Sequence, residues 1–184
     1  KAGIEVSYFV MMGAGGKDNC KESALESARV LNEVDPEFIR LMSLRVKPGS
    51  GLERMVKAGE FVIPSEKEMV EEQLLMIENL NVTSYYSNDH IMNLFIEVEG
   101  QLPRDKEKLT GTLKSYLGLS DKDRRIFEYG VRTGQMITLS DMQNEIKYKK
   151  SENTMNRILK ELNGQGNLTD AEILNYLRYL YTSS

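Results

Sequence analysis

The sequence predicts an α/β protein, in which strands alternate with helices in the first part of the chain and helices alone form the last part. Two stretches, 4–12 and 38–46, have the β-branched, aromatic and apolar residues of buried strands, and a helical pattern over 22–34 lies between them. A strand, a helix and a second strand in succession form a βαβ unit, which favours parallel strands and a right-handed crossover. From residue 119 onward the strand signals mostly vanish.

The first predicted strand, 4–12, alternates at first and then becomes continuously apolar at Val10, Met11 and Met12. A strand of this kind is usually buried on both faces, as in a parallel sheet that is covered by helices. The chain supplies too few strands to complete such a sheet. We therefore expect its partner to be a missing N-terminal half of the same protein, or a second copy that associates through the exposed edge of the sheet.

Sequence signals for helix ends are clear at several places. Two capping-box patterns, 65–68 and 169–172, mark helix starts, because a Ser or Thr is followed three residues later by Glu. Gly59 is placed to end a short helix over 52–58 in left-handed geometry. The other expected elements are helices over 65–80, 103–118, 120–132, 151–162 and from 169 onward, and a short strand over 81–86.

Composition excludes several classes of function. The chain has 184 residues and a net charge of -4, and its basic residues gather only in a short run at 147–150, so we expect no nucleic-acid partner. No apolar stretch approaches the ~20 residues that span a bilayer, and the first residues form no secretory signal pattern. We therefore expect no membrane association and a cytoplasmic location.

Cysteine and histidine counts limit the metal chemistry. Cys20 and His90 are the only residues of their types. A single thiol makes neither an internal disulfide nor a cluster site built from several thiolates, and a single histidine makes no multi-histidine site. We therefore expect no metal site from these residues alone, and we interpret Cys20 as an incidental thiol.

A glycine cluster after the first strand is a candidate for ligand binding. Gly13, Gly15 and Gly16 follow a buried strand and precede a helix, a place where backbone amides can approach an anionic or nucleotide ligand. Their spacing fits neither the dinucleotide fingerprint nor the phosphate loop. A purely structural turn is therefore the alternative, because glycine is the usual residue for uncommon backbone angles.

Charged and polar side chains near the second strand and beyond it are further candidates. Arg40 and Arg45 lie in or at the end of an apolar strand, where they either pair with acids such as Glu5 or present a cation to the carboxylate of a substrate. His90 lies among polar residues that include Asn93. It either anchors its loop by hydrogen bonds or contacts a substrate or cofactor.

Several runs of residues resemble radical S-adenosylmethionine (radical SAM) proteins. Residues 3–16, 28–41 and 48–52 are similar to the last two strand units of that family, with its glycine-rich strand end and its "PGTPL" turn, here Pro-Gly-Ser-Gly-Leu. Residues 87–93 and 99–106 are similar to a segment that follows the barrel in one bacterial and archaeal subgroup. The resemblance covers about residues 1–118, and the tail has no counterpart in it.

The resemblance implies a fragment of a partial (β/α)6 barrel with a mainly helical C-terminal extension. Residues 1–60 would be the last two strand units, 61–118 a post-barrel extension and 119–184 an all-helical tail. Radical SAM enzymes hold a 4Fe-4S cluster by three cysteines in a CxxxCxxC loop and use it to cleave S-adenosylmethionine reductively to a 5′-deoxyadenosyl radical. Because this chain lacks that loop, the parent protein would be the enzyme, with an unknown substrate, and the fragment alone would be inactive.

The resemblance also implies where ligands lie, since ligands of parallel α/β folds gather at the carboxyl ends of strands. The residues expected near the adenosyl moiety are Met12, Gly13, Gly15, Leu44, Arg45 and Val46. Those expected on the substrate side are Arg40, His90 and Asn93. Two alternatives belong to other classes: a non-catalytic binding module whose tail helices recruit a protein partner, and an unrelated nucleotide-binding α/β protein that uses the glycine turn.

Overall fold

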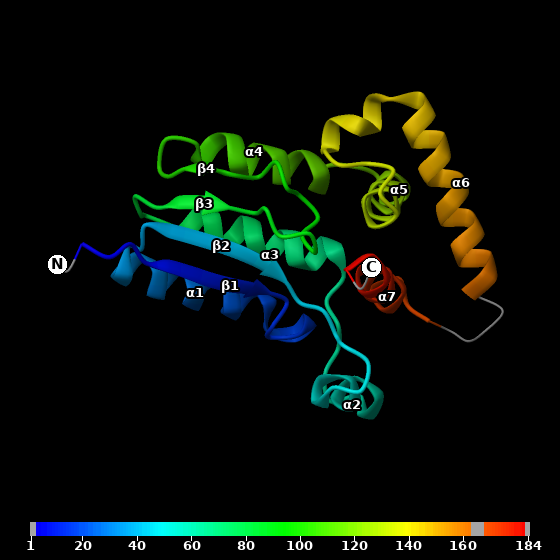
Figure 1. The fold of residues 1–184 in the computed structure, drawn as a ribbon, viewed down its shortest axis with the longest axis horizontal. Helices are drawn as coiled ribbons and strands as arrows, with labels where there is room; N and C mark the ends of the chain where they lie inside the picture. Colours follow the sequence, from blue (N-terminus) through cyan, green and yellow to red (C-terminus); the bar gives the residue numbers. More distant parts are fainter. Residues whose placement is uncertain (1–2, 163–167, 183–184) are drawn as a thin grey trace.

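A four-stranded sheet with helices packed against it forms the centre of the molecule in the computed structural model, which describes residues 3–162 and 168–182 (Figure 1). The strand order is β1-β2-β3-β4; β1, β2 and β3 run parallel, and β4 is antiparallel to β3. The strands are β1 (Ser7–Met12), β2 (Phe38–Ser43), β3 (Tyr85–Ser87) and β4 (Gly100–Gln101).

The helices form two groups. One group packs along the sheet: α1 and α3 lie side by side behind it in Figure 1, and α4 packs beside α3. The other group lies at the end of the sheet toward which β1 and β2 point. The elements are η1 (Lys17–Asn19), α1 (Cys20–Val34), α2 (Gly51–Ala58), α3 (Glu66–Asn79), α4 (Lys106–Leu117), α5 (Asp121–Arg132), η2 (Leu139–Gln143), α6 (Glu145–Leu162) and α7 (Asp170–Thr182).

The main core lies between the sheet and the helices α1 and α3. Strand residues on this side are Ile39, Leu41 and Tyr86, which are almost completely buried. The register places Tyr86 beside Ile39, and both pack in the same hydrophobic cluster as Ala28 and Leu31 of α1. Successive strand residues point to opposite faces, so this pattern fixes which side of each strand faces the helices.

The opposite face of the sheet is uncovered along β1 and partly exposed along β2. Phe9 and Met11 of β1 are 65% and 43% exposed, whereas Tyr8 and Val10 between them pack against the core. Figure 1 shows none of the described helices in front of β1 and β2. Strand β1 is also the edge of the sheet, because β2 is its only neighbour among the described strands.

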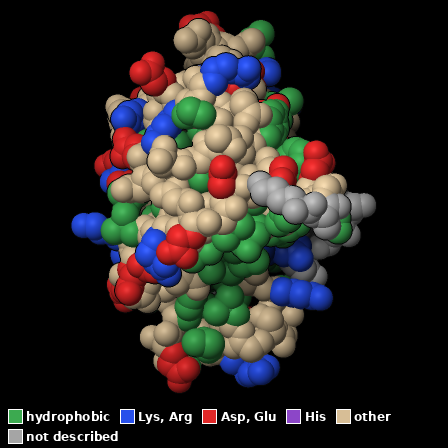
Figure 2. Space-filling view, turned by 90° about the vertical axis from the view of Figure 1, so that its left-hand side faces the viewer, with side chains coloured by type: hydrophobic (Ala, Val, Ile, Leu, Met, Phe, Trp, Pro, Cys, Tyr) green, Lys and Arg blue, Asp and Glu red, His purple; other side chains and the backbone are tan. Residues whose placement is uncertain are grey.

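Exposed apolar surface continues past the beginning of β1. Figure 2 looks at the side of the molecule on which the N-terminus lies and shows hydrophobic side chains gathered in the middle of that side. Ile4, Val6 and Val34 are exposed and together line one shallow pocket beside the start of β1. Clustered exposed apolar surface on a protein commonly marks a contact with another surface.

The tail helices pack on one another and on the rest of the molecule. Helix α5 contacts both α6 and α7. Phe127 of α5 stacks on Phe95 with ring centroids 5.5 Å apart, and Phe95 meets Tyr116 of α4 edge-on at 5.2 Å. Apolar residues of α7 are buried as well, among them Leu174 and Leu177. The described part of the tail therefore belongs to the main core, which counts against a tail whose apolar stripe is free to recruit a partner.

The structure confirms the α/β class and the parallel strand, helix, strand order, but several boundaries differ from the sequence prediction. Strand β1 begins at Ser7 instead of residue 4, and β2 ends at Ser43 instead of 46. Helix α6 begins at Glu145 instead of residue 151. Strand β4 was not predicted, because two residues carry too short a pattern to recognise.

Both capping boxes are confirmed, and each satisfies backbone amides that a helix start leaves without a partner. At α3 the Ser65 hydroxyl accepts from the Glu68 amide at 3.2 Å, and the Glu68 carboxylate accepts from the Ser65 amide at 2.8 Å. Thr169 and Glu172 exchange the same bonds before α7. Gly59 ends α2 with a φ of 73°, as predicted.

Candidate functional site at the carboxyl ends of the strands

The glycine turn after β1 lies against helix α3. Gly13 has a φ of 82°, and a Cβ added to it would lie 3.1 Å from the sulfur of Met69. Its amide donates a hydrogen bond of 2.8 Å to the buried carboxylate of Glu72. The Glu72 carboxylate of the same chain is therefore the acceptor for this backbone amide. The absence of a side chain at Gly13 allows both the positive φ and the close contact with Met69.

The segment after β2 is held by helix α7. Leu44 and Val46 are buried, and the Leu44 amide continues the sheet by donating to the carbonyl of Met12 at 2.9 Å. Asn175 of α7 bonds Val46 twice: its side-chain oxygen accepts from the Val46 amide at 2.8 Å, and its amide donates to the Val46 carbonyl at 3.2 Å. The backbone groups predicted to face an adenosyl ligand are thus bonded to the tail, and Arg45 between them is partly exposed.

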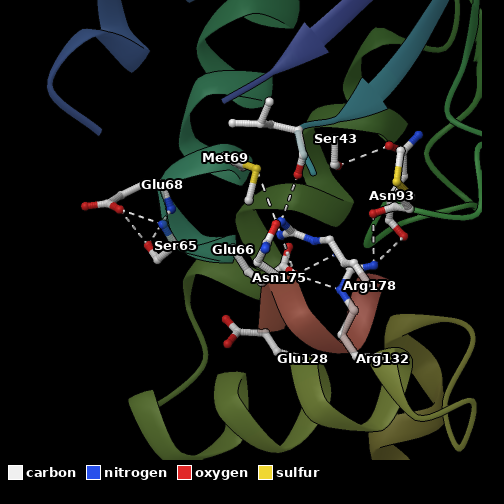
Figure 3. A network of polar contacts seen from close by, with 12 residues as sticks. Ser43, Ser65, Glu66, Glu68, Met69, Asn93, Glu128, Arg132, Asn175 and Arg178 are labelled. Atoms are coloured by element: carbon white, nitrogen blue, oxygen red, sulfur yellow. Dashed lines mark hydrogen bonds and ion pairs between the residues drawn. The ribbon is translucent and has the colours of Figure 1, made fainter. Parts of the chain in front are cut away.

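A buried cluster of one acid and two arginines joins α3, α5 and α7 at this end of the sheet (Figure 3). The carboxylate of Glu66 accepts from Nε of Arg132 at 2.7 Å, and it pairs with the guanidinium of Arg178 at 2.6 Å. All three side chains are at most 3% exposed. Burial alone would raise the pKa of Glu66, but the two guanidinium groups outweigh it and lower that pKa below its ordinary value.

The same two arginines also donate hydrogen bonds to backbone carbonyls in the segments that follow β2 and β3. Arg178 donates to the carbonyl of Leu44 at 3.1 Å, and Arg132 donates to the carbonyl of Met92 at 2.9 Å. Asn93 follows in this loop and donates to the carbonyl of Leu41 at 2.9 Å, while its side-chain oxygen accepts from the hydroxyl of Ser43 at 3.1 Å. These bonds link the end of β2, the loop after β3 and the tail into one rigid arrangement.

The structure places the three residues predicted on the substrate side, Asn93, His90 and Arg40, in three different environments. Asn93 is buried and its amide is used within the loop. His90 is partly exposed, and its Nδ1 accepts from the amide of Met92 at 3.3 Å, which is the loop-anchoring alternative. Arg40 is on the open face of β2, 3.6 Å from the carboxylate of Asp89, and not beside the Glu5 that the sequence suggested.

Sequence reasoning did not single out Glu66, Arg132 and Arg178. Glu66 entered the prediction only as part of a capping box. A signal existed in α7, where Arg178 follows Leu174 by four residues and so lies on the apolar stripe of the helix. An arginine on such a stripe is rarely buried without a partner, but the acid on α3 lies too far away in the sequence to be matched with it.

A second buried acid lies beside this cluster. Glu128 of α5 accepts a hydrogen bond from the hydroxyl of Tyr116. Burial, followed by the negative charge of Glu66, raises the pKa of Glu128 from 4.5 to about 8. Near neutral pH this carboxyl is therefore mostly protonated, although it lies in a cluster of charged groups.

Replacing Glu128 by glutamine should remove a pH dependence of stability. In the folded protein Glu128 keeps its proton up to about pH 8, whereas the unfolded chain releases it near pH 4.5. The stability of the wild type should therefore fall as the pH rises through this window, with a slope of at most about 1.4 kcal/mol per pH unit, and Glu128→Gln should lack this contribution. Urea unfolding across the window measures it. Glu107→Gln, at an exposed position of α4, is the control and should keep the slope of the wild type.

The lone thiol lies near the glycine turn. Burial, with the nearby charge of Glu72 as the next cause, raises the pKa of Cys20 to about 12, so the thiol stays protonated. A 4Fe-4S cluster needs several thiolates, and one protonated thiol does not fit it. In the described part of the chain, no three His, Cys, Asp or Glu side chains lie together so that they could hold a metal ion.

Comparisons of the chain with known protein families, with curated proteins and with solved structures found no match. Among the described residues no helix is both long and apolar enough to cross a membrane.

Proposed function

We propose that this chain is the C-terminal part of a radical SAM enzyme, whose complete form uses a 4Fe-4S cluster to cleave S-adenosylmethionine reductively. The chain would contribute the last two strand units of the partial barrel, the extension after them and the helical tail. It would be inactive by itself. The enzyme would lie in the cytoplasm, because reducing compartments preserve the thiolates that bind a cluster.

The observation that carries this proposal is strand β1. Its six residues contain no charge and no proline, although it is an edge strand with an uncovered face. Natural edge strands are usually protected by lysine, proline or a bulge against pairing with another strand. A parallel edge strand without such protection, followed by a helix and a second parallel strand, is expected where a larger α/β sheet or barrel continues.

The strand ends support the proposal in a second way. The Gly13 turn and the segment 44–46 meet at the carboxyl ends of adjacent parallel strands, where ligands of such folds bind. Backbone groups of Gly13, Leu44 and Val46 are bonded within the chain. This chain would therefore hold the wall behind a ligand in a fixed shape, and the partly exposed Gly15 and Arg45 would be the candidates to face an adenosyl group. Met12 is buried in the core and its carbonyl accepts from the Leu44 amide, so its side chain does not face such a ligand. The cluster itself would have to be held by cysteines from elsewhere in the enzyme.

The two other functions have less support. A partner-recruiting tail would need an uncovered apolar stripe, and Ile173, Leu174 and Leu177 of α7 are buried. A nucleotide site at the glycine turn would need free amides, and the Gly13 amide already donates to Glu72.

Anaerobic reconstitution with iron and sulfide tests the proposal. The full-length product of the gene that encodes this chain should bind a cluster, shown by its iron and sulfide content and visible absorption, and should form 5′-deoxyadenosine from S-adenosylmethionine under reducing conditions. The chain of 184 residues should do neither. A cluster with S-adenosylmethionine cleavage on the isolated chain, or a full-length product without both, would refute the proposal.

A further inference from the structure

The open face of the sheet has one charged position in an otherwise apolar and uncharged surface. Side chains in register across parallel strands share a face, so Phe9, Arg40 and Ser87 form one row on this side. The neighbouring rows contain Met11 with Met42, and Ser7 with Phe38 and Tyr85. An arginine in the central strand is therefore flanked by aromatic and methionine side chains.

The guanidinium of Arg40 is weakly engaged. Its one partner in the described structure is Asp89 at 3.6 Å, beyond the distance of a good hydrogen bond, and the two side chains are 42% and 57% exposed. An ion pair so exposed contributes little to stability. Arginine has five N–H donors in a planar fork that matches a carboxylate, so most of its binding capacity is unused here.

We infer that the open face of the sheet binds a molecule with one carboxylate and an apolar body, with the carboxylate on Arg40 and the body over Phe9 and Met42. This inference rests on the proposed function, because in a partial barrel this face of β1 and β2 lines the interior, where the substrate lies. It assigns the chemical class of that substrate as a carboxylic acid with apolar substituents.

Asp89 restricts which anions fit. Its carboxylate lies next to Arg40 and repels a second negative charge, so a monoanionic carboxylate is favoured over a phosphate, which carries more charge. The apolar side chains around Arg40 favour a ligand with an aromatic or aliphatic part over a small hydrophilic acid. An amine of the same shape would be repelled by Arg40.

Amide chemical shifts of the isolated chain test the inference with three probes: 4-phenylbutyrate, the matching amine 4-phenylbutylamine, and inorganic phosphate. The butyrate should shift amides of β1 and β2, and the other two should bind more weakly. Arg40→Gln should weaken binding of the butyrate roughly tenfold, because it removes one charge-assisted pair. Asp89→Asn should strengthen it, because the competing carboxylate is gone. Arg29→Gln removes an exposed arginine of α1 and should leave binding unchanged.

Equal affinity of Arg40→Gln and wild type for the butyrate would overturn the inference, as would equal or tighter binding of the amine or of phosphate. The measurement needs neither a cluster nor S-adenosylmethionine. If the butyrate does not bind while the full-length protein cleaves S-adenosylmethionine, this inference fails and the proposed function stands. If the butyrate binds to Arg40 while the full-length protein forms no cluster, the proposed function fails. The inference that this face binds apolar carboxylic acids then still stands.

Discussion

Replacing Glu66 by glutamine is expected to lower the free energy of unfolding by about 3–5 kcal/mol, because it removes the carboxylate that two buried guanidinium groups share. Glu66 pairs directly with both Arg132 and Arg178. The glutamine side chain has nearly the same shape, so the effect comes from charge and not from a cavity. Urea unfolding near neutral pH, followed by circular dichroism, measures it.

The matched control is Glu71→Gln in the same helix. The Glu71 side chain is 50% exposed and pairs with Lys67 at 3.5 Å, so its loss should change stability by less than about 0.5 kcal/mol. If Glu66→Gln cost no more than this control, the buried cluster would not be what holds the tail to the strand ends.

Replacing Phe127 by alanine should also cost about 3–5 kcal/mol, the usual range for truncating a fully buried phenylalanine. Phe127 belongs to the tail, yet it stacks on Phe95 and lies 6.0 Å from the ring of Tyr116, both outside the tail. The loss should therefore shift the unfolding of the whole chain as one transition. Circular dichroism, which follows secondary structure, and tyrosine fluorescence, which follows the surroundings of the tyrosines, should give the same midpoint.

Ile146→Ala is the control for Phe127, because Ile146 of α6 is 79% exposed and its truncation should be nearly neutral. Two separate transitions in Phe127→Ala, with the strands keeping the wild-type midpoint, would mean that the tail folds independently. That result would favour the alternative in which the tail is a binding module for a protein partner.

Local signals made much of the fold predictable, and long-range contacts account for most of what was missed. The starts of α3 and α7 follow from a Ser or Thr and a Glu three residues apart, which act within one turn of helix. The end of β2 could not be placed, because residues 44–46 are apolar like the strand but bond to Asn175, more than a hundred residues further along the chain. No pattern within the strand contains that information.

At the candidate site, too, local patterns were predictable and long-range contacts were not. The edge of the sheet at which the site lies was predicted, since the parallel strands β1 and β2 both end at that edge. The roles of single side chains were not, because a polar residue in a loop has the same sequence pattern whether it contacts a ligand or its own backbone. Asn93 illustrates this: the sequence suggested a substrate contact, and the structure shows a side chain bonded to Leu41, Ser43 and Asn88.

Amide hydrogen exchange of β1 tests the central claim most directly. Val6 and Met12 direct their carbonyls toward β2, so the alternating residues Ser7, Phe9 and Met11 direct their backbone groups to the open edge. The account predicts that these three amides exchange rapidly in the isolated chain and become strongly protected in the full-length gene product, where a further strand pairs with them. Equally rapid exchange in both proteins would contradict it, because β1 would then be a true edge and not part of a larger barrel.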